Sequence, residues 1–163
     1  IRAGEWPILG FCGGLQLIAM AHGAPLGPLR RLRAGETAAT DSFGPGYFKE
    51  YGFTPVQIVR DDPLFAGLGP NPIFLESHYW EVKEPPAGFV TLASNDNCRV
   101  QAMRRADRLI FGMQFHPEGY TTKPHDMLSL STLSGHYPEG YPEARPDGRR
   151  LIENFFKMAG VRT

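Results

Sequence analysis

The sequence predicts an α/β domain of three layers, built around a mostly parallel sheet with an antiparallel extension. Three observations support this fold class. A short apolar run at residues 6–11 precedes glycines and an apolar helical segment at residues 14–22. Several short runs of β-branched and aromatic residues follow, and an amphipathic helical pattern occupies residues 151–159. A length of 163 residues suits one domain that spans residues 1–163.

Composition excludes several classes of function. Seventeen Lys and Arg residues balance seventeen Asp and Glu residues, so no long-range field attracts the chain to nucleic acid or to an anionic membrane surface. No apolar run approaches the roughly 20 residues that cross a bilayer, and no segment resembles a signal peptide. We therefore expect a soluble cytoplasmic protein that acts on a small molecule and binds neither nucleic acid nor membrane.

The first elements are a strand and a helix. Residues 6–11 read WPILGF, which is typical of a strand buried on both faces in a parallel sheet. Residues 14–22 leave almost no polar face and predict a buried helix, which Gly23 ends. Residues 24–46 contain several Gly and Pro residues and predict loops with short strands.

The middle of the chain predicts further sheet elements. We expect a strand at 53–59, a helical turn at 63–68 and a brief strand at 73–75. Three more strands are expected at 89–93, 99–103 and 109–115, the last two joined as a hairpin around Asp107. The final strand places His116 at its C-terminal end.

The remaining chain divides into a loop and a helix. Residues 121–146 are rich in Pro, Gly, His, Ser and Tyr without any period, which indicates a long surface loop. Asp147 is expected to cap a helix that Gly160 ends. Its apolar positions recur at intervals of three and four residues: Leu151, Ile152, Phe155, Phe156 and Ala159.

Cys12 has the setting of a nucleophile. It lies in GFCGGLQ, between the first strand and the first helix, which is the nucleophile-elbow arrangement. Gly10 and Gly14 permit the sharp turn, and the helix N-terminus favours a thiolate. The N–H of Gly13 is expected to face a developing oxyanion. The alternative, a small buried apolar residue, suits Cys98 better, because Cys98 follows a turn and begins a strand.

His116 is the best-placed of five histidines to serve as the base. It closes a strand, and active sites of open α/β sheets lie beyond the carboxyl ends of their strands. Glu118 can turn back to accept a hydrogen bond from the imidazole. An isolated His-Pro-Glu would more often be a solvated turn. His125 and His136 lack the spacing of a zinc site, so we expect no metal and no cofactor.

Together, GFCGGLQ and GMQFHPE resemble the G-x-C-x-G-x-Q and Q-F-H-P-E signatures of class I glutamine amidotransferases. The similarity continues through Ser77-His78, LASNDNC and LIENFF, and it omits residues 121–146. It implies a flavodoxin-like fold. It also implies that Cys12 attacks the glutamine side-chain amide to form a glutamyl thioester, that His116 transfers the proton, and that Glu118 orients His116.

The resemblance also suggests substrate-binding residues and a partner. Gln16 is similar to the motif glutamine that helps to hold the substrate, and Glu50-Tyr51-Gly52 is similar to a stretch whose backbone binds its amino acid end. The stretch from Ser77 to Cys98 is most similar to the amidotransferase part of GMP synthetases. Any chemistry on an ammonia acceptor would then belong to a synthetase partner chain.

The sequence departs from the family pattern at its start. Members usually place a β-α-β segment before the elbow, with a loop that supplies the second oxyanion donor, and this chain begins at Ile1 without them. One lost donor costs about 100- to 1,000-fold in rate, so we expect weak activity from these residues alone. We expect either a longer native chain or a partner that covers the sheet edge.

Two other functions remain open at this stage. The same residues could form a free-standing γ-glutamyl hydrolase, with residues 121–146 shaping its pocket. A non-catalytic binding or regulatory module of the same fold is the other alternative. Ser77-His78 is interpreted equally as a partner-facing pair or as a polar strand end.

Overall fold

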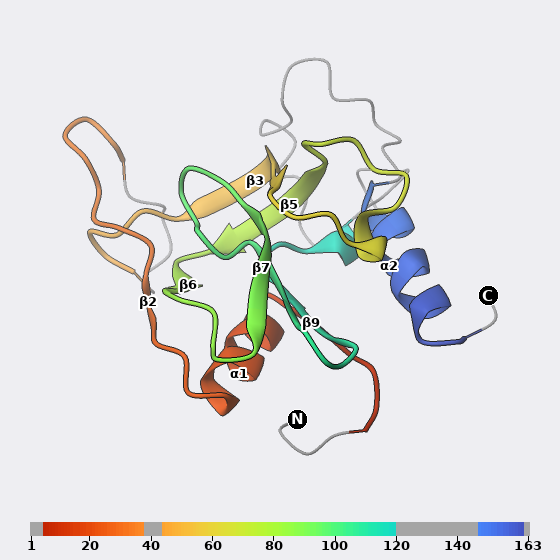
Figure 1. Cartoon of the computed structure of the whole chain (residues 1–163). Helices are drawn as coiled ribbons and strands as arrows, with labels where there is room; N and C mark the ends of the chain where they lie inside the picture. Colours follow the sequence, from red (N-terminus) through yellow and green to blue (C-terminus); the bar gives the residue numbers. More distant parts are fainter. Residues whose placement is uncertain (1–4, 38–43, 120–146, 162–163) are drawn as a thin grey trace.

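A computed structural model describes residues 5–37, 44–119 and 147–161. Its main sheet has five strands in the order β1-β9-β8-β7-β4 (Figure 1). These strands are β1 (Ile8–Phe11), β4 (Gln57–Ile58), β7 (Phe89–Ser94), β8 (Ala102–Arg105) and β9 (Ile110–Met113). Two further ladders pair β2 (Leu26–Pro28) with β6 (Trp80–Val82) and β3 (Glu50–Pro55) with β5 (Ile73–His78).

The α/β class is confirmed, and the sheet is mixed. Within the described residues, β1 and β9 form its one parallel pair, while β9–β8, β8–β7 and β7–β4 are antiparallel. Antiparallel pairing therefore outweighs the expected parallel pairing in this part of the chain. The expected hairpin around Asp107 is confirmed, because it connects β8 to β9.

Several strand boundaries differ from the sequence expectation. The strand expected at 53–59 divides after Pro55, so that β3 pairs with β5 and β4 joins the main sheet. The strand expected at 99–103 begins three residues later, as β8, and the strand expected at 73–75 extends to His78. β6 was not expected. Short strands shift in this way because cross-strand partners, rather than local preference, determine where pairing begins.

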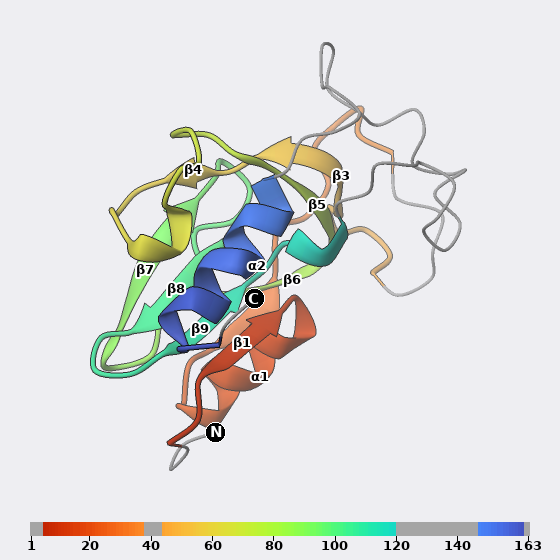
Figure 2. The ribbon, with the colours of Figure 1, turned by 90° about the vertical axis from the view of Figure 1, so that its right-hand side faces the viewer.

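Two helices cover opposite faces of the sheet, which gives the expected three layers (Figure 2). On one face, α1 (Gly13–Ala21) buries Leu15, Ile18 and Ala19. The other face is covered by α2 (Asp147–Met158). Neighbouring residues of β9 alternate between the two cores, since Ile110 belongs to the α1 side and Phe111 to the α2 side.

The first strand and helix are less buried than expected. All four residues of β1 are half-buried, and β1 lies at an edge of the described sheet. On α1, Leu17 and Met20 are each 56% exposed, so this helix is not buried all round. Its apolar composition predicted a helix correctly but did not predict which face would lie in the core.

Glycines allow α1 to approach the sheet closely. Gly10 and Gly112 are register partners on β1 and β9. A Cβ at Gly10 would lie 2.8 Å from the carbonyl carbon of Gly14, and one at Gly112 would lie 3.1 Å from Cα of Leu15. A Cβ at Gly14 would meet nothing within 4 Å. The close approach therefore depends on Gly10, and not on both predicted glycines.

Helix ends largely follow the expectation. His22 and Gly23 end α1, and Gly23 has φ +83°. Asp147 occupies the first turn of α2, where its carboxylate accepts a hydrogen bond from the backbone N–H of Ile73. The loop expected at 121–146 lies outside the described residues. In the part of the chain that the structure describes, no helix is long and apolar enough to cross a membrane.

Candidate active site

The backbone at Cys12 has the strained turn of a nucleophile elbow. Cys12 joins β1 directly to α1 with φ 47° and ψ −105°, and it is the one non-glycine residue with positive φ among the described residues. Its N–H donates to the carbonyl of Met113 at 2.7 Å. Such a conformation persists only where the surrounding structure holds it, which is typical of functional positions.

His116 lies immediately beyond β9, beside Cys12. Its backbone N–H donates to the carbonyl of Leu75 at 2.8 Å, which ties the turn after β9 to β5. The neighbouring ring of Phe115 stacks on Phe74 with 4.0 Å between centroids. These contacts bring the imidazole of His116 into hydrogen-bond contact with the thiol of Cys12.

Glu118 completes the predicted trio. Its Oε1 lies 2.7 Å from Nδ1 of His116. The turn carrying both residues is the short 3-10 helix Pro117–Gly119, and the start of α2 packs against it so tightly that a Cβ at Gly148 would lie 2.1 Å from the Pro117 carbonyl oxygen. The structure therefore brings together all three residues that the sequence singled out.

This geometry favours a thiolate–imidazolium pair. Burial opposes ionisation of Cys12, but the hydrogen bond from His116 and the positive charges of His116 and His78 outweigh it, and the pKa of Cys12 is lowered. The hydrogen bonds with Cys12 and Glu118 raise the pKa of His116 to about 10. The N–H of Gly13 also hydrogen-bonds to the Cys12 sulfur. By contrast, burial raises the pKa of Cys98, so that thiol stays protonated.

Two glutamines lie beside the sulfur. The Nε2 of Gln114, a fully buried residue, lies 3.7 Å from Sγ of Cys12. Gln16, one turn into α1, donates from Nε2 to the Trp80 carbonyl at 3.0 Å and to Oε1 of Gln114 at 3.3 Å. Its predicted part in holding a substrate stays a prediction. Gln114 was part of the quoted motif, but its contact with the nucleophile was not foreseen.

The predicted stretch Glu50-Tyr51-Gly52 lies in β3 and faces a different set of partners. Glu50 is 2% exposed, and its carboxylate accepts hydrogen bonds from four side chains. Gly52 has φ +100°, a conformation that glycine adopts readily. The binding of a substrate by this backbone stays a prediction. The four donors to Glu50 are His78, Asn95, Asn97 and Gln101.

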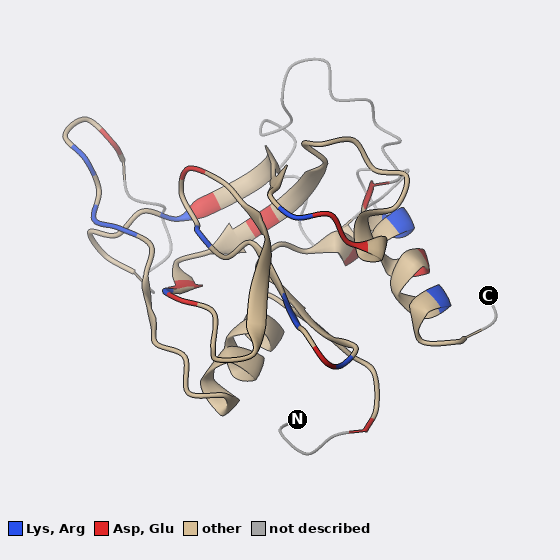
Figure 3. Ribbon diagram, viewed as in Figure 1, with Lys and Arg blue, Asp and Glu red and all other residues tan. Residues whose placement is uncertain are grey.

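Glu50 belongs to a buried acidic pair around His78. Figure 3 shows acidic positions on the adjacent strands β3 and β5, where Glu50 is opposite His78 and Glu76 is opposite Gly52. The Nε2 of His78 lies 3.0 Å from Oε2 of Glu50 and 3.2 Å from Oε2 of Glu76. Sequence reasoning assigned no part to Glu76 or Gln101; the available signal was a polar residue inside each apolar strand.

These three side chains are also the group with metal-compatible spacing among the described residues. The hydrogen bonds offer a different account. The Nδ1 of His78 lies 3.0 Å from the Trp80 carbonyl oxygen, which can only accept, so Nδ1 carries hydrogen. With Nε2 facing two carboxylates, His78 has the partners of an imidazolium. Burial opposes that charge, but the two glutamates raise the pKa of His78 to about 9.

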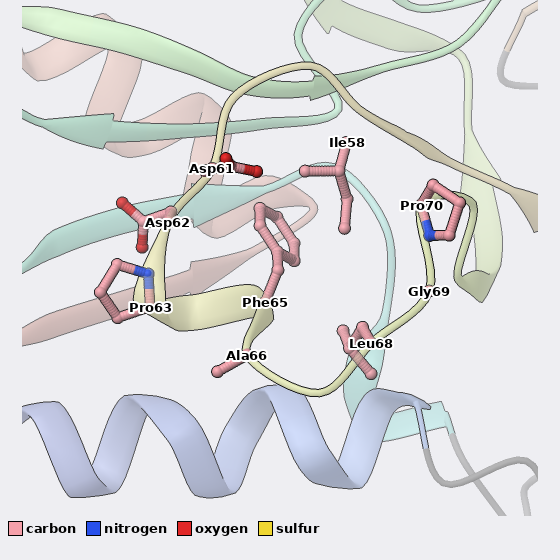
Figure 4. A pocket seen from close by; sticks show the side chains of 9 residues that line it. All are labelled: Ile58, Asp61, Asp62, Pro63, Phe65, Ala66, Leu68, Gly69 and Pro70. Atoms are coloured by element: carbon pink, nitrogen blue, oxygen red, sulfur yellow. The ribbon is translucent and has the colours of Figure 1, made fainter.

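A separate hollow of about 560 Å³ lies along residues 58–70 (Figure 4). Its acidic residue Asp62 already accepts hydrogen bonds from Leu64 N–H and from Arg104, the latter at 2.6 Å. Cys12, His116 and Glu118 do not line this hollow. It is therefore distinct from the site around the sulfur.

Fold and site define a cysteine-nucleophile α/β domain, and comparison with known proteins identifies its family. The glutamine amidotransferase class-I family matches residues 1–133. The chain belongs to this family, which confirms the resemblance drawn from GFCGGLQ and GMQFHPE.

The most similar curated relatives include glutamine-hydrolyzing subunits of GMP synthases. That of Methanothermobacter thermautotrophicus is 38% identical over 94% of this chain and 61% of the relative, and that of Sulfolobus acidocaldarius is 44% identical over 69% and 50%. A crystal structure from Thermoplasma acidophilum, assigned as the corresponding GMP synthase subunit, has a TM-score of 0.65, with 25% identity over 98% of this chain and 60% of that one. The chain thus spans about half to three fifths of the length of these proteins.

Proposed function

We propose that this chain is a glutaminase subunit or domain that hydrolyses the side-chain amide of glutamine and supplies ammonia to a synthetase. The contact that carries this proposal is the Cys12–His116–Glu118 arrangement, in which a thiol at an elbow meets an imidazole held by a carboxylate. Membership of the amidotransferase family and the names of its GMP synthase relatives support it.

The first half of the reaction forms a thioester. The thiolate of Cys12 attacks the amide carbon of glutamine, and a C–S bond forms. The N–H of Gly13 at the start of α1 stabilises the developing oxyanion. The imidazolium of His116 then protonates the amide nitrogen as the C–N bond breaks, so that ammonia leaves and His116 becomes neutral.

The second half regenerates the enzyme. Neutral His116 takes a proton from water, and the oxygen attacks the thioester carbon. The C–S bond breaks, which restores the thiolate–imidazolium pair, and the proton of the new carboxylic acid passes to ammonia. Glu118 holds the ring throughout and stabilises its cationic form. The balance is glutamine plus water giving glutamate plus ammonium.

The acceptor chemistry is assigned to a partner. By similarity to the GMP synthase relatives, we propose that the ammonia passes to a GMP-forming synthetase subunit in the cytoplasm, where thiols such as Cys12 stay reduced. No metal or cofactor enters the proposed glutaminase steps.

The test is glutamate release from glutamine, measured with the chain alone and with the synthetase subunit of a relative's GMP synthase. Turnover in either setting, absent in Cys12→Ser, supports the proposal. Preferential hydrolysis of γ-glutamyl peptides would instead indicate a γ-glutamyl hydrolase. No turnover in any setting, with Cys12 unreactive toward a glutamine-directed electrophile, would indicate a non-catalytic module.

A further inference from the structure

The buried cluster around His78 is connected to the nucleophile by a continuous series of hydrogen bonds. The carbonyl oxygen of Trp80 accepts from Nδ1 of His78 and from Nε2 of Gln16, each at 3.0 Å. The same Gln16 nitrogen lies 3.3 Å from Oε1 of Gln114, whose own Nε2 lies 3.7 Å from the Cys12 sulfur. One backbone carbonyl therefore links the two sites.

His78 is held rigidly enough to fix that carbonyl. Its ring is 4% exposed and both nitrogens are occupied, one by Trp80 and one by the acidic pair. Trp80 is 49% exposed and lies in the three-residue strand β6, so its position is not set by burial of its own side chain. The His78 hydrogen bond supplies a fixed reference from the protein interior.

The acidic pair makes His78 a donor at both nitrogens. Glu50 receives N–H groups from Asn95 and Gln101 as well, at 2.6 and 2.9 Å, so its carboxylate is fully occupied as an acceptor. Both oxygens of Glu76 lack a well-directed hydrogen bond although this residue is fully buried. A cation between them is the arrangement that compensates two buried carboxyl groups.

We propose that His78 is a positioning residue for the Cys12 nucleophile. As an imidazolium between two glutamates, it holds the Trp80 carbonyl, and this carbonyl orients the two glutamines that reach the sulfur. Its positive charge adds to that of His116 in favouring the thiolate. The inference rests on the proposed function, since it concerns the nucleophile of that reaction.

The titratable groups around His78 act in two directions. Glu50 on β3 and Glu76 on β5 stabilise its charge, whereas burial opposes it. Burial raises the pKa of Glu76 to about 7, so this carboxyl is partly protonated near neutral pH. Cys12 and His116 are the ionisable groups on the catalytic side.

The experiment measures the pKa of Cys12 from the pH dependence of its alkylation by iodoacetamide, a readout that needs no glutamine turnover. In His78→Gln the pKa should rise by about half a unit to one unit, so that alkylation at pH 7 slows about threefold to tenfold. In Gln16→Met, which breaks the series beyond Trp80, a smaller rise is expected. An unchanged pKa of Cys12 in folded His78→Gln would overturn the proposal.

Asn154→Leu is the matched control for general loss of stability. Asn154 is 8% exposed and donates to the carbonyls of Leu64 and Ala66, both at 2.9 Å. Its replacement should lower stability without changing the pKa of Cys12. If His78→Gln does not fold, an unchanged pKa of Cys12 in Gln16→Met overturns the proposal.

The metal alternative is tested on the same samples. Elemental analysis of the purified protein should show no stoichiometric divalent metal, and a chelator should leave the alkylation profile unchanged. A bound metal would overturn the proposal, because Nε2 of His78 would then be a ligand and not a donor. Absent glutaminase activity with a shifted pKa of Cys12 in His78→Gln would contradict the proposed function alone.

Discussion

Two histidines in this domain meet glutamates, and they differ in how they are held. His116 pairs with Glu118, two residues away, in a turn where the side chains are 28% and 44% exposed. His78 lies between Glu50 and Glu76, where the three side chains are at most 2% exposed, and Glu50 is far away in sequence. The pKa of both histidines is raised, to about 10 and about 9.

The difference separates reaction chemistry from support. The His116 pair is local, open to solvent and in contact with a thiol, so it can exchange protons with a substrate. The His78 cluster is enclosed, so its charge is fixed and serves its surroundings. Buried ion clusters are costly to break, whereas exposed pairs contribute little stability.

The largest expected effect is on turnover. His116→Ala should lower glutamine hydrolysis by at least about 1,000-fold, because it removes both the proton donor and the partner of the thiolate. Cys12→Ser should abolish it. Steady-state glutamate release measures both, and a His116→Ala variant that retains more than a tenth of the activity would contradict the assignment.

Stability should show the opposite ranking of the two clusters. Glu50→Leu is expected to destabilise the domain by about 3–5 kcal/mol, since it leaves the His78 cation and several N–H groups without their acceptor. Glu118→Gln should change stability by less than about 1 kcal/mol. Urea unfolding of the two variants side by side would measure this, and equal losses would erase the distinction.

Glu118→Gln should affect activity more than stability. The loss of the carboxylate weakens the orientation and charge of His116, and a fall of at least about tenfold in kcat is expected. The drop should remain smaller than that of His116→Ala. Unchanged kcat with altered stability would assign Glu118 a structural part instead.

The smallest expected effect is a slope in stability against pH. The pKa of His78 is raised from its usual 6.5 to about 9, so its contribution is complete below pH 6.5 and is lost as the pH rises through 9. Glu76, raised from 4.5 to about 7, adds a loss in the same direction between those values. His78→Gln should flatten the decline in Tm between pH 7 and 9, whereas Glu118→Gln should keep it.

The sequence predicted the local cluster and not the distant one, for a physical reason. Cys12 and His116 each follow a strand whose apolar pattern is visible, and the carboxyl ends of the parallel pair β1 and β9 meet at one edge. Glu118 is fixed by the short turn after His116. These relations follow from periodicity and strand direction.

The His78 cluster depends on registers that no local pattern reveals. Glu50 reaches His78 only because β3 pairs antiparallel with β5, and the expected strand at 53–59 did not include Glu50. The link to Cys12 passes through the backbone carbonyl of Trp80, in the unexpected strand β6. A backbone acceptor carries no residue signature, so sequence reasoning could not find it.

The most direct test of the Cys12 nucleophile is its labelling by 6-diazo-5-oxo-L-norleucine, a glutamine-directed electrophile, followed by intact-mass and peptide mapping. The account predicts one adduct, on Cys12, that glutamine protects against and that His116→Ala suppresses, while the buried thiol of Cys98 stays unmodified. An unlabelled Cys12, or an adduct that glutamine does not prevent, would contradict it.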